Sequence, residues 1–102
     1  MTTVHTLASG SSGNAAVLSC GDTHLLIDAG ISCRRITAAL KELGLTPADL
    51  TAILITHTHS DHISGLNTLL KKTDCPILAT PRTCRELDCR FPGIEPRLME
   101  AE

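Results

Sequence analysis

The sequence predicts a mixed α/β fold, and three observations support this. Short β-prone runs separated by turn residues fill the first 30 positions. Two later segments carry apolar residues at helical spacing. Between them, residues 52–55 form a continuous apolar, largely β-branched run, which is typical of a strand buried on both faces. With 102 residues, the chain has room for one small domain.

The amino-terminal part predicts three strands, at residues 3–7, 15–19 and 23–27. The second and third strands flank the turn residues 20–22, which contain a Gly-Asp pair, and they are therefore expected to form a hairpin. The loop between the first and second strands is rich in glycine and serine. The third strand ends at Asp28, just before Gly30.

A helix is expected over residues 33–43, because Ser32 can cap its first turn and apolar residues recur at helical spacing. Gly44 is suited to the left-handed residue that ends a helix, and Pro47 prevents continuation. After the strand at 52–55, the pattern predicts a helix over 64–72, a strand over 76–79 and a helix from Pro81 to Leu87. From Phe91 onward, prolines and Gly93 interrupt every period, and no regular element is expected there.

Composition excludes several classes of function. The net charge is −2, so no overall basic field indicates a nucleic acid or an anionic membrane as partner. Phe91 is the only aromatic residue other than histidine, which argues against binding of single strands by base stacking. No apolar run approaches the ~20 residues of a membrane span. The five cysteines lack disulfide or zinc-cluster spacing and no secretory signal is recognisable, so reduced thiols and a cytoplasmic location are expected.

Three of the five histidines lie within six residues, directly after the apolar strand: His57, His59 and His62, with Asp61 beside the last. In an extended segment, residues two apart project to the same side, so His57 and His59 can aim at one point. A turn after Ser60 brings Asp61 and His62 to a neighbouring point. Imidazole and carboxylate suit zinc, iron or manganese. The pattern predicts a two-metal site, in preference to a histidine-rich surface loop.

The segment His57-Thr58-His59-Ser60-Asp61-His62 resembles the HxHxDH signature of the metallo-β-lactamase superfamily. The strand ending at Asp28 and the apolar strand before the signature agree with this resemblance, which covers about residues 1–80. The loop Ala8-Ser9-Gly10-Ser11-Ser12-Gly13-Asn14 is similar to a narrower branch, the bacterial metal-dependent hydrolases described as DNA exonucleases and linked to cell-wall regulation. The resemblance therefore implies a metal-dependent hydrolase acting on nucleic acid or another phosphoester substrate.

The resemblance also implies roles for individual residues. His57 and His59 are similar to the ligands of a first divalent metal ion, and Asp61 and His62 to those of a second. The expected metal is zinc, with manganese or iron as alternatives. Asp61 would also orient the attacking water as the catalytic residue. Asp28 would support the metal loop through hydrogen bonds, although it could equally be a turn-forming residue before Gly30. The loop Ser9, Gly10, Ser11, Ser12, Gly13 and Asn14 would contribute to substrate binding, or would simply connect two strands.

The pattern of the family is incomplete in this chain. The family completes its site with two histidines and a bridging aspartate from later segments, whereas no histidine follows His62 here. We therefore expect residues 1–102, with the motif loop at 56–62, to be the amino-terminal half of an αββα sandwich, as a truncated product or a fragment. Such a half would associate with itself or with the missing half. The alternatives are a non-catalytic or partner-dependent metal-binding fragment, and a β-lactam or thioester hydrolase of the same fold.

Overall fold

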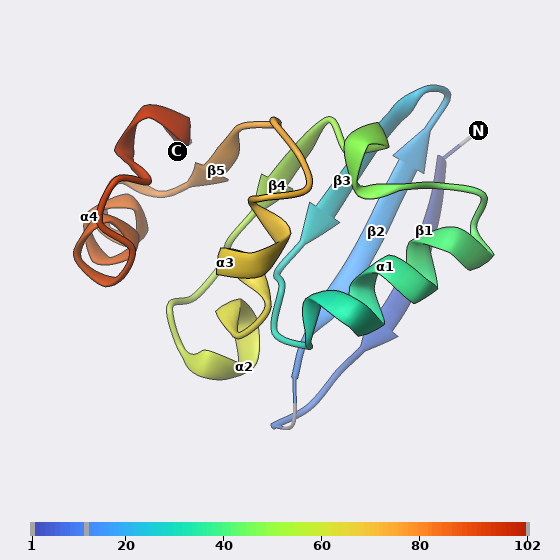
Figure 1. Ribbon diagram of the computed structural model, residues 1–102, viewed down its shortest axis with the longest axis horizontal. Coiled ribbons are helices and arrows are strands. Elements are labelled where there is room, and N and C mark those ends of the chain that lie inside the picture. Colours follow the sequence, from blue (N-terminus) through green and yellow to red (C-terminus); the bar gives the residue numbers. More distant parts are fainter. Residues whose placement is uncertain (1, 12, 102) are drawn as a thin grey trace.

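The computed structural model describes residues 2–11 and 13–101, without the side chains of Ser60 and Asp61. A mixed α/β arrangement confirms the fold class (Figure 1). The strands are β1 (Thr2–Ala8), β2 (Ala15–Cys20), β3 (Thr23–Ile27), β4 (Ala52–Leu54), β5 (Ile77–Ala79) and β6 (Leu98–Glu100). The helices are α1 (Cys33–Glu42), α2 (Ser60–Ile63), α3 (Leu66–Leu69) and α4 (Pro81–Arg90), with single 3-10 turns η1 (Pro47–Asp49) and η2 (Glu95–Arg97).

All six strands form one sheet, and they lie in the order of the sequence. β1, β2 and β3 pair antiparallel as consecutive hairpins, and β3, β4, β5 and β6 pair in parallel. Each parallel step needs a crossover, and α1, the pair α2 and α3, and α4 supply the three crossovers. The carboxyl ends of β3, β4 and β5 consequently meet at one edge of the sheet, where residues 28, 56 and 80 follow them.

One face of the sheet is covered by helices. Val17, Leu26, Ile53 and Ile77 occupy paired positions across β2 to β5 and are fully buried. They share a core with residues of α1, α3 and α4 that include Leu40, Leu69 and Leu87. Burial of this row, together with the helices, accounts for the main hydrophobic stabilisation of the chain.

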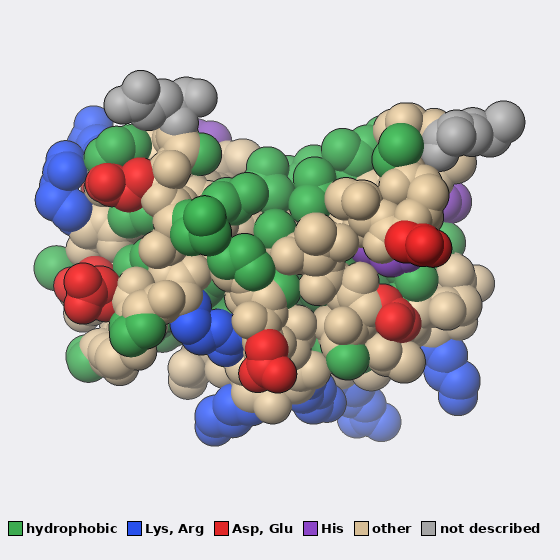
Figure 2. Space-filling model, turned by 90° about the horizontal axis from the view of Figure 1, so that it is seen from above, with side chains coloured by type: hydrophobic (Ala, Val, Ile, Leu, Met, Phe, Trp, Pro, Cys, Tyr) green, Lys and Arg blue, Asp and Glu red, His purple; other side chains and the backbone are tan. Residues whose placement is uncertain are grey.

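The other face of the sheet carries apolar side chains that are only partly buried. Ile27, Leu54 and Leu78 are paired neighbours on this face, and the row continues to Met99 in β6, which is 53% exposed. In Figure 2, hydrophobic side chains gather along the upper, concave edge of the view, and most lysines and arginines lie along the lower edge. The sheet is thus two-sided, with helices on one side and an apolar surface on the other.

Local signals in the sequence are confirmed at α1. Ser32 caps the helix by accepting a hydrogen bond from the Arg35 amide (3.2 Å), and Gly44 adopts a left-handed φ of 78° after its end. The hairpin of β2 and β3 also forms around Gly21. α4 begins at Pro81, as predicted, and continues to Arg90, beyond the predicted end at Leu87.

Two expectations about secondary structure were wrong. Residues 64–72 do not form one helix, since α2 begins inside the motif at Ser60 and α3 starts again after Gly65. The Gly65 amide donates to the Ala29 carbonyl (2.8 Å), a contact made outside any helix. The carboxy-terminal part is also more regular than expected, because β6 (Leu98–Glu100) pairs with β5. No helix in the described part of the chain is both long and apolar enough to cross a membrane.

Candidate metal centre

The motif residues follow β4 at the edge where the parallel strands end. His57 and His62 have ring centres 4.8 Å apart, and His57 and His59 have ring centres 6.2 Å apart with nearly parallel planes. The chain turns into α2 after His59, and the His62 amide donates to the His59 carbonyl (2.9 Å). Three imidazoles that the sequence spreads over six positions therefore lie as neighbours.

Asp28 holds the two segments of this edge together. Its buried carboxylate accepts hydrogen bonds from the Thr56 amide (2.8 Å) and the Thr56 hydroxyl (2.7 Å), and lies 2.8 Å from Nδ1 of His62. Its φ of 64° is left-handed, a conformation that aspartate tolerates better than most residues. Asp28 is thus more than a turn residue, because its side chain joins the end of β3 to the motif.

These hydrogen bonds decide which imidazole nitrogens can carry a lone pair. A carboxylate can only accept, so His62 donates its Nδ1 proton to Asp28, and the lone pair resides on Nε2. The Thr56 hydroxyl donates its hydrogen to Asp28, so its oxygen can accept a hydrogen bond from Nδ1–H of His57, 3.0 Å away. In both histidines the Nε2 atom is left as the basic nitrogen. An orienting hydrogen bond on the other ring nitrogen is typical of histidines that bind metals.

The structure describes only some of the other predicted site residues. The side chain of Asp61 lies outside the described residues, as does the whole of Ser12. Among the side chains that are described, no group of three His, Cys, Asp or Glu residues is arranged to hold a metal ion. The three imidazoles are of the donor type that suits zinc, iron or manganese, and His57 and His62 also have the Nδ1 hydrogen bond that is typical of metal-binding histidines.

The serine- and glycine-rich loop packs beside the segment that follows Asp28. The Asn14 carbonyl accepts from the Gly30 amide (2.8 Å), and the Asn14 side chain closes the loop through two hydrogen bonds to Gly10 (3.1 and 2.9 Å). A Cβ at Gly13 would lie 2.6 Å from the Gly30 carbonyl oxygen, so only glycine allows this approach. Ser9 and Ser11, the described serines of the loop, are exposed.

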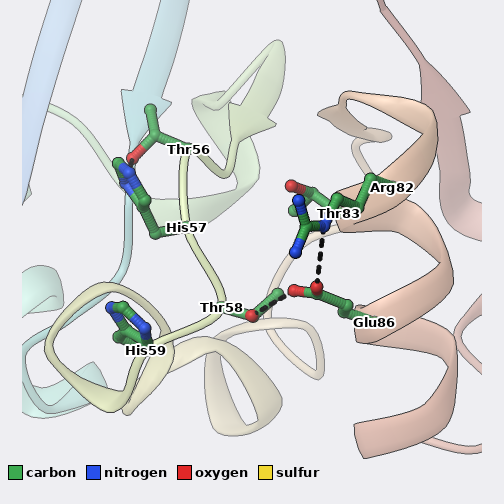
Figure 3. Close-up of a pocket in the computed structure, with 7 residues that line it drawn as sticks. All are labelled: Thr56, His57, Thr58, His59, Arg82, Thr83 and Glu86. Carbon is green, nitrogen blue, oxygen red and sulfur yellow. Dashed lines mark hydrogen bonds and ion pairs between the residues drawn. The ribbon is translucent and has the colours of Figure 1, made fainter.

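Sequence reasoning did not identify the residues that α4 contributes beside the motif. A hollow of about 340 Å³ is lined by Thr56, His57, Thr58 and His59 on one side and by Arg82, Thr83 and Glu86 on the other (Figure 3). The Thr58 hydroxyl donates a hydrogen bond to the Glu86 carboxylate. This hydrogen bond, with smaller contributions from Arg82 and Arg90, lowers the pKa of Glu86 below its usual value of 4.5. The sequence signal that could have pointed to these residues was the helix predicted to start at Pro81, because this helix follows the strand that pairs with β4.

The sequence is similar to those of known proteins. The family model described as "Metallo-beta-lactamase superfamily" matches residues 8–88. The exodeoxyribonuclease WalJ of Streptococcus pneumoniae is 46% identical over 82 residues, which cover 80% of this chain and 30% of that protein. The exodeoxyribonuclease YycJ of Bacillus anthracis is 42% identical over 82 residues, covering 80% and 31%. This chain thus spans about a third of the length of these relatives.

A solved structure shows the same fold. The metallo-β-lactamase SMB-1 bound to 2-mercaptoethanesulfonate superposes with a TM-score of 0.77, covering 97% of this chain and 44% of that one at 23% identity. The sheet and crossover helices described above therefore correspond to part of a larger known fold.

Proposed function

Since the chain belongs to the metallo-β-lactamase superfamily, we propose that it supplies a metal-binding part of a hydrolase that cleaves phosphodiester bonds in DNA. The observation that carries this proposal is the set of three neighbouring imidazoles at the end of β4, two of which have Nδ1 directed to Thr56 or Asp28. The names of the relatives at 46% and 42% identity support DNA as the substrate. The fold of the family implies divalent metal ions, usually zinc.

Each residue of the motif has a proposed role. His57 and His59 would bind one metal ion, and Asp61 and His62 a second, with Asp61 assigned only from its position in the motif. When bound, the ions would activate water and stabilise the negative charge that develops on the phosphate. Asp28 and Thr56 would hold His62 and His57 in one tautomer and orientation, so that Nε2 of each ring faces the metal.

The isolated chain is expected to hydrolyse DNA poorly or not at all. Its motif supplies about two ligands for each ion, whereas catalytic zinc usually has three protein ligands. An incompletely held ion neither positions nor acidifies water well. Manganese-dependent cleavage of single-stranded DNA by the 102-residue chain, abolished by Asp61→Ala, would show instead that this half is sufficient.

A chimera tests the proposed function directly. The 82 matched residues of the Streptococcus pneumoniae relative would be replaced by the corresponding residues of this chain, and nucleotide release from DNA would be measured with zinc or manganese. We expect cleavage that falls at least about 100-fold when His57 and His59 are both changed to alanine, and no such loss in a His5→Ala control. A folded, metal-loaded chimera that cleaves only a β-lactam or a thioester would overturn the assignment to phosphodiesters.

A further inference from the structure

Three arginines lie along one face of α4, beside the motif. Arg82, Arg85 and Arg90 are spaced by three and five residues, and all three are exposed. Together with Thr58, His59 and Glu86 they line a hollow of about 610 Å³. Figure 3 shows Arg82 and Glu86 projecting from the helix toward the side of the motif loop that carries Thr58. A locally basic surface thus adjoins the proposed metal centre of a chain whose net charge is −2.

The helix is fixed in place relative to the motif. Thr83, Cys84 and Leu87 are buried on its inner face, and α4 packs against β5 and β6. On its outer side, the Glu86 carboxylate accepts from the Thr58 hydroxyl and pairs with Arg82, whose Nε lies 3.4 Å away. The arginines are therefore carried by a preorganised support, which reduces the entropic cost of binding a ligand.

Arg85 and Arg90 contribute little to the structure of the described part of the chain. Arg97 differs from them, since its guanidinium donates to the carbonyls of Leu70, Thr73 and Cys75. Within the described residues, neither Arg85 nor Arg90 makes a hydrogen bond or an ion pair. Among the described side chains, Glu86 is the one carboxylate that lines the hollow, and it already has two partners. The guanidinium groups of Arg85 and Arg90 are therefore available to bind phosphates.

We propose that this face of α4 binds the backbone phosphates of a single DNA strand whose reacting phosphodiester lies at the imidazoles. The proposal rests on the proposed function and extends it to the path of the substrate. From Arg82 to Arg90 the helix rises about 12 Å, which is longer than one phosphate group and suits a strand. Since Phe91 is the only Phe, Trp or Tyr, recognition depends on phosphates and not on base stacking. Binding is therefore independent of base sequence.

The test is binding of a fluorescent single-stranded oligothymidylate to the 102-residue chain, measured by anisotropy in EDTA over a range of salt concentrations. Arg82→Ala, Arg85→Ala and Arg90→Ala together are expected to weaken binding at least tenfold. They should also reduce the slope of log affinity against log salt by about 2, at ~0.7 for each lost phosphate contact. The matched control, Arg34→Ala with Arg35→Ala and Lys41→Ala, removes the same charge from exposed positions of α1 and should leave binding nearly unchanged.

A charge-preserving variant and other polyanions complete the test. Arg82→Lys with Arg85→Lys and Arg90→Lys keeps the charge and should retain most of the affinity, which separates a phosphate contact from a folding defect. Equal losses in the α4 and α1 variants, or tighter binding of poly-glutamate or RNA than of the oligothymidylate, would overturn the proposal. Because EDTA prevents metal-dependent cleavage, strand binding is measured separately from the reaction. Strand binding by the chain through the α4 arginines, combined with a chimera that does not cleave DNA, would refute the proposed reaction alone. Cleavage by the chimera without any effect of the α4 arginines would refute this inference alone.

Discussion

Asp28 and His62 are 34 residues apart in the sequence, yet the Asp28 carboxylate lies 2.8 Å from Nδ1 of His62. The same carboxylate accepts two hydrogen bonds from Thr56, so the ends of β3 and β4 and helix α2 are joined at one side chain. The side chain of Asp28 is 7% exposed and that of His62 is 18% exposed. A hydrogen bond shielded from water in this way is well suited to fix the orientation of an imidazole.

Replacement of this carboxylate tests its contribution. Asp28→Asn preserves the size of the side chain and its tolerance of a left-handed φ, but places at most one acceptor oxygen where the carboxylate has two. We expect zinc affinity, measured by isothermal titration, to fall 10- to 100-fold. Asp22→Asn, at an exposed turn, is the control. Equal affinities for the two variants would show that Asp28 does not orient a metal-binding histidine.

The isolated chain should bind zinc or manganese weakly, through His57, His59, Asp61 and His62. Weak binding is expected because these four residues do not include the two histidines and the bridging aspartate that the family takes from later segments. Calorimetry should give a dissociation constant above about one micromolar, and His57→Ala with His59→Ala should remove the binding of one of the two ions, unlike His5→Ala. Submicromolar binding that survives the double substitution would place the metal elsewhere.

Gly65 is expected to be intolerant of any side chain. A Cβ at this position would lie 2.0 Å from the Ile31 carbonyl oxygen, which belongs to the backbone and not to a flexible side chain. Gly65→Ala should lower the free energy of unfolding by about 1–3 kcal/mol in a urea titration. Ser64→Ala, at an exposed position in the same turn, should change it by less than about 0.5 kcal/mol. Similar stabilities would mean that the backbone yields at this contact.

The hydrogen bond from Thr58 to Glu86 should make stability dependent on pH. Because the folded pKa of Glu86 is lower than its usual value of 4.5, the contribution is fully present above 4.5 and is lost as pH falls through the folded pKa. Wild type should therefore lose more stability than Thr58→Val between pH 7 and pH 3. Urea titrations at both pH values measure this difference, and Thr68→Val, at an exposed position of α3, is the control. Parallel losses in all three proteins would contradict the coupling.

The partly buried apolar face of the sheet should drive self-association. Val4 is 64% exposed, Met99 is 53% exposed, and both lie on the side away from the row of Val17 and Ile53. An exposed apolar sheet face with open edges favours association. Light scattering after size exclusion should show species larger than a monomer, and Val4→Lys with Met99→Lys should shift them toward monomer.

Ala38→Lys, an exposed position of α1 on the helix-covered side, is the control for this experiment and should not shift the distribution. A wild-type monomer with one cooperative thermal transition above about 50 °C, in the range of ordinary domains, would contradict the expectation.

The sequence alone determined the elements whose causes are local. The hairpin of β2 and β3 follows from a Gly-Asp turn between β-prone runs, and α1 follows from its Ser32 cap, its apolar spacing and Gly44. The motif at 56–62 could also be read directly, because its histidines are adjacent in the chain. Each of these features depends on residues within about ten positions of one another, so no knowledge of the fold is needed to predict them.

The tertiary structure decided whatever depends on distant partners. Residues 64–72 have a helical pattern, but Gly65 approaches Ala29 and Ile31, and only Leu66–Leu69 of this segment are helical, as α3. β6 has no clear sequence signal, and its strand conformation depends on pairing with β5. The arginines of α4 lie beside the motif because α4 follows β5, the parallel neighbour of β4. Periodicity reports how one segment is patterned, whereas the pairing of strands depends on contacts across the whole chain, which no local pattern records.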